Sequence, residues 1–315
     1  MESSALTEGA RPQWYAHGYN RAELYRLAAV MGWLPRRPRL ALARRLGHLA
    51  QSFLPVERAA ARKTLAVMTG AGGRRLDELT AEVFGEFAMC FSDLITASRR
   101  PARIGSYLSE IRGREHLQSF DGALISLTAH VGNWELAGRV LAQHSARTTH
   151  VVVAVEEARA LERWLRRDGA GLRFVPRSHP TVSLTLIAAL RRGDAVALQG
   201  DRALGTRGDV MIPFFGRPAP FPVGPFHLAR AAGVPVLPAF CTLDGDGRYV
   251  LRVLPLLKIA RGGEEEALAA WVGMLEQIVA EKPTQWFNFF DVWRSLGEWE
   301  PGPAQANPDA AAEAP

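Results

Sequence analysis

The sequence predicts an α/β fold in which a mixed, largely parallel sheet is flanked by helices, with a helical region at the N-terminal end. Two observations carry this prediction. From about residue 110 onward, short apolar runs alternate with segments whose apolar residues recur at helical spacing. From Trp14 to about Ala97, the apolar residues recur at helical spacing. With 315 residues the chain is long enough to bury a full core.

The elements follow one another along the chain in a simple order. Residues 1–12 are expected to be a flexible leader, 13–298 a single domain with a helical part (13–100) and an α/β core (101–298), and 299–315, rich in Pro and Ala, a disordered tail. Strands are expected near 123–129, 149–155, 172–176, 195–200, 235–243 and 248–257. Helices are expected near 134–143, 157–167, 180–192, 225–232 and 264–281.

The helical N-terminal part contains a segment that suits a lipid surface. Pro35, Pro38 and Pro55 divide this part into pieces. Between Trp33 and Leu46, aromatic and aliphatic residues stand beside a cluster of arginines. Such a helix can lie in the plane of an anionic membrane, or pack as an ordinary amphipathic helix on the core. No run of about 18 apolar residues predicts a membrane span.

The composition narrows the partners and the chemistry. The formal net charge is +6, and Lys occurs only at 63, 258 and 282, so nearly all positive charge is Arg. This balance fits an anionic lipid surface, an acidic protein partner or simply an Arg-favouring genome. No nucleic-acid partner is expected, because the arginines are scattered and no binding module appears. Cys90 and Cys241 are isolated, so neither a disulfide framework nor a paired metal motif is predicted.

The segment from Ser126 to Glu135 is the strongest functional signal. An apolar strand delivers His130 to its end, a Gly-Asn break follows, and helical spacing resumes at Trp134. In one continuous helix His130 and Glu135 would point in different directions, at about 3.6 residues per turn. With the histidine on the strand end and Glu135 in the first helical turn, the two can converge. A histidine beside a carboxylate is equipped to act as a general base.

A second set of polar residues follows the strand expected at 195–200. Asp201 and Arg202 should emerge on the same sheet edge as His130, since the carboxyl ends of parallel strands meet there. Two carboxylates, Glu135 and Asp201, can therefore approach one histidine, and the sequence leaves open which of them touches it.

Further segments suggest where a substrate binds. Residues 208–225 form an apolar but not strand-like loop rich in Pro, Gly and Phe; Phe214 and Phe215 can line a groove for a chain-like ligand, or the loop can cap the core. Arg163 and Arg166 can hold a phosphate or carboxylate, or stay solvated. The aromatic run at 285–293 favours core packing.

Together these segments resemble the bacterial lipid A biosynthesis acyltransferase family, the late or lauroyl-type members of the lysophospholipid acyltransferase superfamily. The resemblance rests on His130-Val-Gly-Asn-Trp-Glu135, on Asp201-Arg202, on Ile212-Pro-Phe-Phe-Gly216 with Gly224-Pro225, and on the ending Trp286-Phe-Asn-Phe-Phe-Asp-Val-Trp293. It extends over about residues 20–295. Many relatives carry Gln or His after the aspartate, where this chain has Arg202.

The resemblance implies a glycerol-3-phosphate acyltransferase-like fold and transfer of a fatty acyl group from an acyl carrier protein or CoA thioester to a hydroxyl of a membrane lipid or glycolipid, such as a lipid A precursor. His130 is implied as the general base, Glu135 as its carboxylate partner and Asp201 as a further member of the site. Asn133, Arg163, Arg166, Arg202, Phe214 and Phe215 are expected to bind substrate, and no metal or cofactor is needed. Oxyanion donors are expected from the Val131–Asn133 backbone or from Arg202.

The resemblance also implies a location at the cytoplasmic face of the bacterial inner membrane. Residues 24–34 are too short and too charged to span, so attachment is expected to be peripheral, on an anionic membrane surface. Two other functions fit the same segments. A thioester hydrolase would release product without an acceptor, although the chain has no Gly-x-Ser-x-Gly elbow. A lipid-binding or assembly protein would bind vesicles without turnover.

Overall fold

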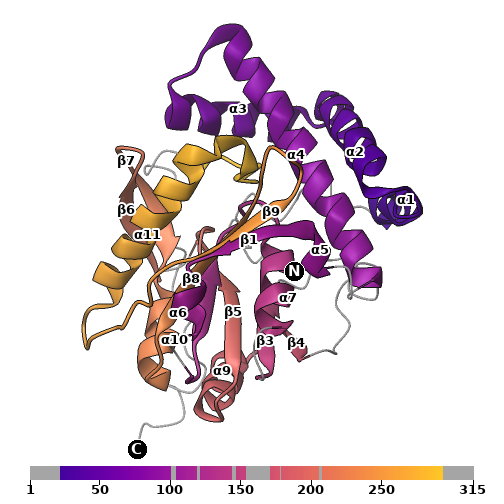
Figure 1. The fold of residues 1–315 in the computed structure, drawn as a ribbon. Helices are drawn as coiled ribbons and strands as arrows, with labels where there is room; N and C mark the ends of the chain where they lie inside the picture. The colour runs from indigo at the N-terminus through magenta and orange to yellow at the C-terminus, as the bar shows by residue number, and fades with distance from the viewer. Residues whose placement is uncertain are drawn as a thin grey trace, which may run out of the picture.

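The N-terminal part of the computed structural model is a layer of helices. The structure describes residues 22–100, 104–118, 121–143, 147–153, 171–177, 179–205 and 208–293. The layer comprises α1 (Ala22–Met31), α2 (Arg36–Ala50), the 3-10 turn η2 (Gln51–Phe53), α3 (Pro55–Thr69) and α4 (Gly73–Arg99). Pro55 opens α3, where a missing amide costs nothing, and Gly70 ends it with φ of 65°. These helices lie at the end of the molecule away from α9 and α10 (Figure 1).

The rest of the chain builds one seven-stranded sheet in the order β1-β9-β8-β2-β5-β3-β4. Five neighbouring strands, from β8 to β4, run parallel, whereas β9 and β1 run the other way. The strands are β1 (Leu108–Arg112), β2 (Ile125–Thr128), β3 (Thr149–Val153), β4 (Leu172–Pro176), β5 (Ala195–Gln199), β8 (Val236–Leu243) and β9 (Tyr249–Val253). The α/β class with a mixed, largely parallel sheet and a helical N-terminal region is therefore confirmed.

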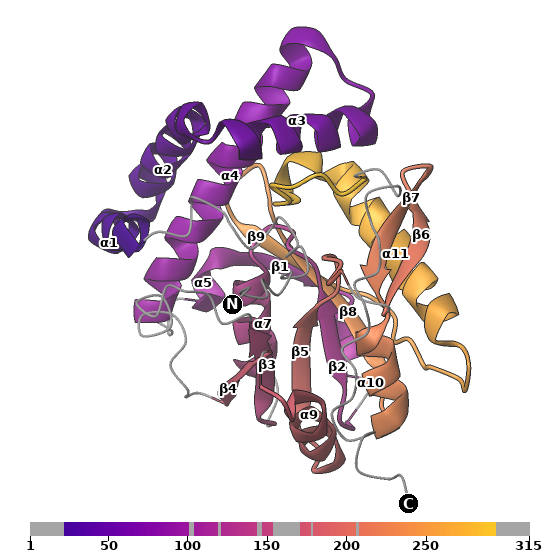
Figure 2. The ribbon, with the colours of Figure 1, turned by 180° about the vertical axis from the view of Figure 1, so that it is seen from behind.

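Helices cover both faces of this sheet (Figures 1 and 2). They are α5 (Ile104–Tyr107), α6 (Arg114–Gln118), α7 (Trp134–Gln143), α9 (Val182–Arg191), α10 (Gly224–Ala232), α11 (Glu264–Glu281) and the 3-10 turn η4 (Pro283–Gln285). Alternate residues of β8 point to opposite faces of the sheet. Leu237 and Ala239 pack with α4 and α7, whereas Val236 and Phe240 pack with α10 and α11. Both strands are covered on both faces, since every residue of β2 and of β8 is buried.

Two details differ from the sequence prediction. Residues 209–222 are not an irregular loop but an antiparallel hairpin, β6 (Asp209–Phe214) and β7 (Arg217–Pro222), which packs beside α11. Its alternating prolines hid the strand pattern, and β1 was not predicted because its residues are mostly polar. The helix expected at 157–167, the leader and the tail lie outside the described residues. No helix within the described ranges is long and apolar enough to cross a membrane.

Candidate active site

The register of two parallel strands brings His130 and Asp201 together. β2 pairs with β5 so that Thr128 lies opposite Gln199, and the Gly200 amide donates to the Thr128 carbonyl at 2.9 Å. Each chain then leaves the same edge of the sheet, and the His130 amide donates to Asp201 Oδ2 at 3.0 Å. The main-chain pairing of β2 with β5 thus places His130 and Asp201 next to each other.

A tight turn after His130 fixes its backbone on two sides. The Gly132 amide donates to the Gln285 carbonyl and the Asn133 amide to the Cys241 carbonyl, both at 2.8 Å, and the Phe287 amide donates to the His130 carbonyl at 2.8 Å. Gly132 has φ of 55°, and a Cβ there would lie 2.1 Å from the Cys241 oxygen. Only glycine fits such an approach. Two of the three backbone amides expected as oxyanion donors are therefore already bound to carbonyls.

The imidazole of His130 pairs with Asp201. Nδ1 lies 2.8 Å from Asp201 Oδ1, and the Trp286 Nε1 donates to Asp201 Oδ2 at 2.9 Å. Asp201 is 2% exposed, and burial by itself would raise the pKa of its carboxyl group. The opposing effects of His130, Arg202 and the Trp286 hydrogen bond prevail and lower that pKa to about 2. Asp201 is therefore ionised and accepts a hydrogen bond from the Nδ1 proton.

This pairing leaves His130 as a neutral ring with a free lone pair. Burial and the neighbouring Arg202 cation lower the pKa of His130 below its ordinary value, and Asp201 only partly opposes them. With the proton on Nδ1, Nε2 is an acceptor. A neutral imidazole whose outer nitrogen carries a lone pair is a general base.

Glu135 and Asn133 occupy different places from those implied by the resemblance. Glu135 lines the same cavity as His130 but makes no hydrogen bond to the ring; its charge faces Arg139, one turn along α7. Asn133 is buried, and its amide nitrogen donates to the Cys90 carbonyl at 3.1 Å and the Tyr249 hydroxyl at 3.2 Å. Its oxygen accepts a hydrogen bond from the Leu136 amide at 3.3 Å, so Asn133 caps α7 and is not among the residues that line the cavity beside His130.

The cavity beside His130 has a volume of about 310 Å³ and mostly apolar walls. Arg177 and Arg202 are its cationic residues, and burial lowers the pKa of Arg177. The walls were not identified from the sequence, because they come from strand ends and helix faces that only the fold brings together: Val151, Phe174, Val182, Leu186, Leu198 and Leu228.

Phe214 and Phe215 do not line this cavity. Phe214 is fully buried against Trp286 and Trp293, with ring centroids 5.2 and 5.9 Å away. Phe215 forms the hairpin turn, where its amide donates to Glu276 at 2.8 Å. Of the hairpin, Pro222 at the end of β7 lines the cavity. Arg163 and Arg166 lie outside the described residues.

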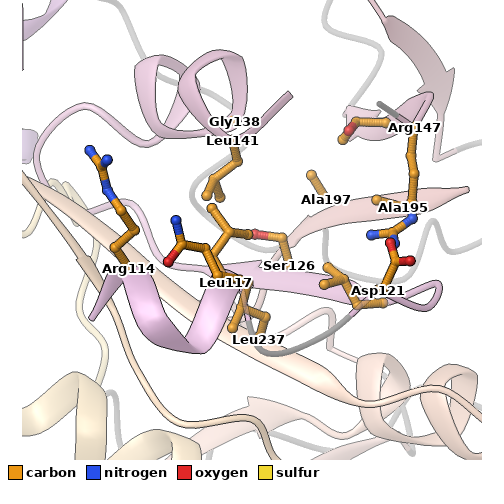
Figure 3. Close-up of a pocket in the computed structure, with 13 residues that line it drawn as sticks. Arg114, Leu117, Asp121, Ser126, Gly138, Leu141, Arg147, Ala195, Ala197 and Leu237 are labelled. Carbon is orange, nitrogen blue, oxygen red and sulfur yellow. The ribbon is translucent and has the colours of Figure 1, made fainter. Parts of the chain in front are cut away.

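Two further cavities lie beside α7, and neighbouring cavities share lining residues. A narrow space of about 30 Å³ shares Glu135, Val151 and Phe174 with the first cavity. It shares Ser126, Gly138, Leu141 and Ala197 with a third cavity of about 340 Å³, where Arg147 pairs with Asp121 at 2.6 Å (Figure 3). We call this series of three spaces the α7 channel. The narrow middle space is lined by small residues, among them Ala137 and Gly138, and by larger ones such as Trp134 and Phe174.

Trp286 is the functional residue that sequence reasoning placed differently. It stands in the aromatic run assigned to core packing, and it does pack in the core at 2% exposure. Its indole nitrogen, however, donates to Asp201. Two signals in the sequence pointed to it: Trp286 belongs to the C-terminal segment that carries the resemblance, and a buried Trp usually finds a partner for its N–H. Within the described ranges no group of three or more His, Cys, Asp or Glu side chains could hold a metal ion.

Comparisons with known proteins place this site in context. The family described as "Bacterial lipid A biosynthesis acyltransferase" matches residues 24–295. The "phosphatidylinositol mannoside acyltransferase" of Mycobacterium tuberculosis is 31% identical over 176 residues, which are 55% of this chain and 54% of that protein. The protein of the same name from Mycolicibacterium smegmatis is 29% identical over 175 residues, 55% and 57% of the two chains. The chain thus spans about half the length of these relatives.

A solved structure is also similar, the 1-acyl-sn-glycerophosphate acyltransferase of Thermotoga maritima. It is 15% identical, with a TM-score of 0.39, over 79% of this chain and 98% of that one.

Proposed function

This chain belongs to the bacterial lipid A biosynthesis acyltransferase family, and from that premise we propose that it transfers a fatty acyl group from a CoA or acyl carrier protein thioester to a hydroxyl of a membrane lipid or glycolipid. The observation that carries the proposal is the His130–Asp201 pair at the mouth of an apolar channel. A base beside apolar walls suits a reaction between a hydroxyl and a long-chain thioester.

The proposed chemistry needs only this chain's own side chains. Nε2 of His130 takes the proton of the acceptor hydroxyl as its oxygen attacks the thioester carbonyl. Asp201 stabilises the imidazolium that forms. The tetrahedral intermediate then collapses, the carbon–sulfur bond breaks, and the thiolate takes the proton from Nε2 to leave as a thiol. Transfer is complete and His130 is neutral again.

The negative oxygen of the intermediate needs a donor, and Arg202 is a cation whose charge acts on both His130 and Asp201. Its Nη2 donates to the Phe287 carbonyl at 3.2 Å, and its guanidinium lies over the Phe290 ring at 5.8 Å. These contacts hold the charge beside the cavity that His130 lines. An oriented cation of this kind stabilises developing charge without reorganising.

The α7 channel is the proposed binding site of the acyl chain. Gly138 lies at its middle, and a Cβ added to this glycine would meet no atom within 4 Å, so a larger side chain can enter the open space. We expect Gly138→Leu to lower kcat/KM for palmitoyl-CoA by about tenfold or more while octanoyl-CoA changes little, because burying or excluding each methylene is worth about 0.8 kcal/mol. The measurement is kcat/KM for a series of acyl-CoA lengths.

Gly273→Leu is the matched control, since Gly273 is exposed on α11 and also has open space at its Cβ. Equal losses for all chain lengths in Gly138→Leu, or the same change of preference in Gly273→Leu, would place the acyl chain elsewhere.

The acceptor is proposed to be a membrane glycolipid. Support comes from the family description and from the names of the mycobacterial relatives. The deciding experiment incubates the purified chain with isotope-labelled palmitoyl-CoA or palmitoyl-acyl carrier protein and, separately, a phosphatidylinositol mannoside, a lipid A precursor and a lysophospholipid. Mass spectrometry then follows the labelled product. Label in one acceptor supports transfer; free labelled fatty acid in every reaction indicates a hydrolase, and intact donor with retained lipid binding indicates a binding protein.

The N-terminal helices carry the proposed membrane contact, on the cytoplasmic face of the inner membrane. In the described part of the chain ten large apolar side chains are exposed, and eight of them lie between residues 27 and 56. They are Leu27, Val30, Trp33, Leu34, Leu42, Leu49, Phe53 and Val56. Arg37, Arg45 and Arg58 are exposed on the same helices. Apolar side chains among arginines favour an anionic lipid surface.

We expect the double variant Trp33→Ser, Phe53→Ser to bind vesicles of phosphatidylglycerol and phosphatidylcholine at least about tenfold more weakly, since each buried aromatic ring contributes roughly 2 kcal/mol. Co-sedimentation measures the partition coefficient. Leu184→Ser is the control, because Leu184 is 67% exposed on α9 at the other end of the molecule. Unchanged binding of the double variant, or equal weakening in the control, would contradict this membrane surface.

A further inference from the structure

A chain of buried polar side chains joins the N-terminal helices to the turn that follows His130. The Asn133 amide nitrogen donates to the Tyr249 hydroxyl at 3.2 Å, and this hydroxyl donates to Asp93 Oδ2 at 3.1 Å. Asp93, on α4, binds two arginines of α2: Arg36, whose Nη2 lies 2.7 Å from Oδ2, and Arg39. We call these five residues the Asp93 network.

The directions of these hydrogen bonds are fixed by their neighbours. The Asn133 nitrogen also faces the Cys90 carbonyl, which can only accept, so the nitrogen must be the donor. The Tyr249 hydroxyl therefore accepts from Asn133 and gives its own proton to Asp93. Burial, with the nearby Asp93 charge, raises the pKa of Tyr249 well above its ordinary value, so the hydroxyl stays protonated.

Burial makes this network intolerant of displacement. Asp93 and Tyr249 are completely buried, Arg39 is 1% exposed and Asn133 is 4% exposed. A buried polar group that loses its hydrogen-bond partner lowers stability, because it no longer has water to bind instead. The network therefore defines one position of α2 relative to the turn at residues 131–133. That turn carries His130 into the site and begins α7.

We propose that Tyr249 is a positioning residue, which, given the function proposed above, holds the His130 turn in the geometry needed for proton transfer by linking it to Asp93 and α2. The nitrogen that it binds lies three residues from His130, and it is the hydroxyl that joins Asn133 to the buried carboxylate. A displacement of the base by a few tenths of an ångström affects the rate of proton transfer more than it affects the binding of substrate.

The test compares Tyr249→Phe, which removes only the hydroxyl, with Tyr107→Phe. Tyr107 is also buried and its ring also contacts Arg36, but it lies outside the hydrogen-bonded path. With palmitoyl-CoA and the acceptor that wild type uses, Tyr249→Phe should lower kcat about 5- to 50-fold with KM within about twofold, a range below that for loss of the base itself. Tyr107→Phe should leave both within about twofold. Equal effects of the two variants, or a change confined to KM, would overturn the proposal.

A second readout does not depend on turnover. Long-range ¹H–¹⁵N spectra of the histidine rings, assigned with His130→Gln, report the tautomer and titration of His130. Tyr249→Phe should shift these signals and Tyr107→Phe should not; unshifted His130 signals in a folded Tyr249→Phe protein would overturn the proposal. If wild type itself lacks turnover, the proposed function fails, while these spectra still decide the positioning role.

Arg36→Gln keeps the experiment informative if Tyr249→Phe does not fold. Arg36 is partly exposed at the start of α2, far along the path from His130. The Arg36→Gln substitution should also lower kcat and should shift the same signals of the His130 ring. Added to Tyr249→Phe, it should cost little more than the single change, because the path is already broken. Fully additive losses would mean that the residues act separately.

Discussion

His130→Ala is expected to lower kcat by about 10² to 10⁴-fold, the usual range for a general base, with a smaller change in KM. Nδ1 is hydrogen-bonded to Asp201 at 2.8 Å. Nε2 is therefore the ring nitrogen that can take the proton from the hydroxyl of the acceptor lipid. The measurement is acceptor-dependent release of CoA thiol together with mass spectrometry of the acylated product.

The dependence of the rate on pH gives a second check of the same residue. Burial and Arg202 lower the pKa of His130 below 6.5, and only the neutral ring can act as a base. kcat/KM should therefore fall as the pH drops through an apparent pKa below 6.5, and should approach its full value well above that pKa. His227→Ala is the control, since His227 is an exposed imidazole on α10 that pairs with Glu264. Near-normal turnover of His130→Ala would remove the histidine from the mechanism.

Asp201→Asn is expected to be nearly as damaging, with a loss of about 10² to 10⁴-fold in kcat. The backbone amide of His130 and the indole N–H of Trp286 both donate to Oδ2 of Asp201. These two donors would keep the side-chain oxygen of an asparagine at the same place. The amide NH₂ then faces Nδ1 of His130 and donates to it. This arrangement favours the tautomer with the proton on Nε2, which can no longer accept a proton from the acceptor.

The same substitution should change how stability depends on pH. The carboxyl pKa of Asp201 is lowered from 3.8 to about 2, so ionisation stabilises the folded state by roughly 2 kcal/mol above pH 3.8. This contribution is lost as the pH falls from 3.8 toward 2. The difference in unfolding free energy between wild type and Asp201→Asn should shrink over that range. Glu135→Gln is the matched control, and a larger loss of kcat there than in Asp201→Asn would return the role of ring partner to Glu135.

The closeness of His130 and Asp201 could be predicted from the sequence, because the positions of strand ends depend only on the main chain. The carboxyl ends of parallel strands lie at the same edge of a sheet whatever their side chains are, so both residues could be placed there from the sequence. The choice between Glu135 and Asp201 could not be made, because it depends on where α7 begins and how it is rotated. The register of β2 with β5, which only the folded sheet fixes, decides in favour of contact with Asp201.

The residues expected to bind substrate were harder to predict, because side-chain direction is a tertiary property. Asn133 has the composition of a site residue but turns inward to cap α7 and reach Tyr249. Phe214 points into the core because β6 pairs with β7 and alternate side chains of the hairpin are buried. The cavity walls come instead from β3, β4, α9 and α10, elements whose sequences are ordinary apolar runs.

Gly132 illustrates how selection can act on a position through the lack of room for a side chain. Any side chain there would collide with the Cys241 carbonyl, so a mutational scan of activity would score this glycine as essential as the base beside it. Its importance would be read as chemistry, although it consists of the absence of a side chain. The side chains of the cavity walls can be exchanged one by one, whereas this turn between strand and helix has no room for a side chain, so a change of specificity would have to arise around it.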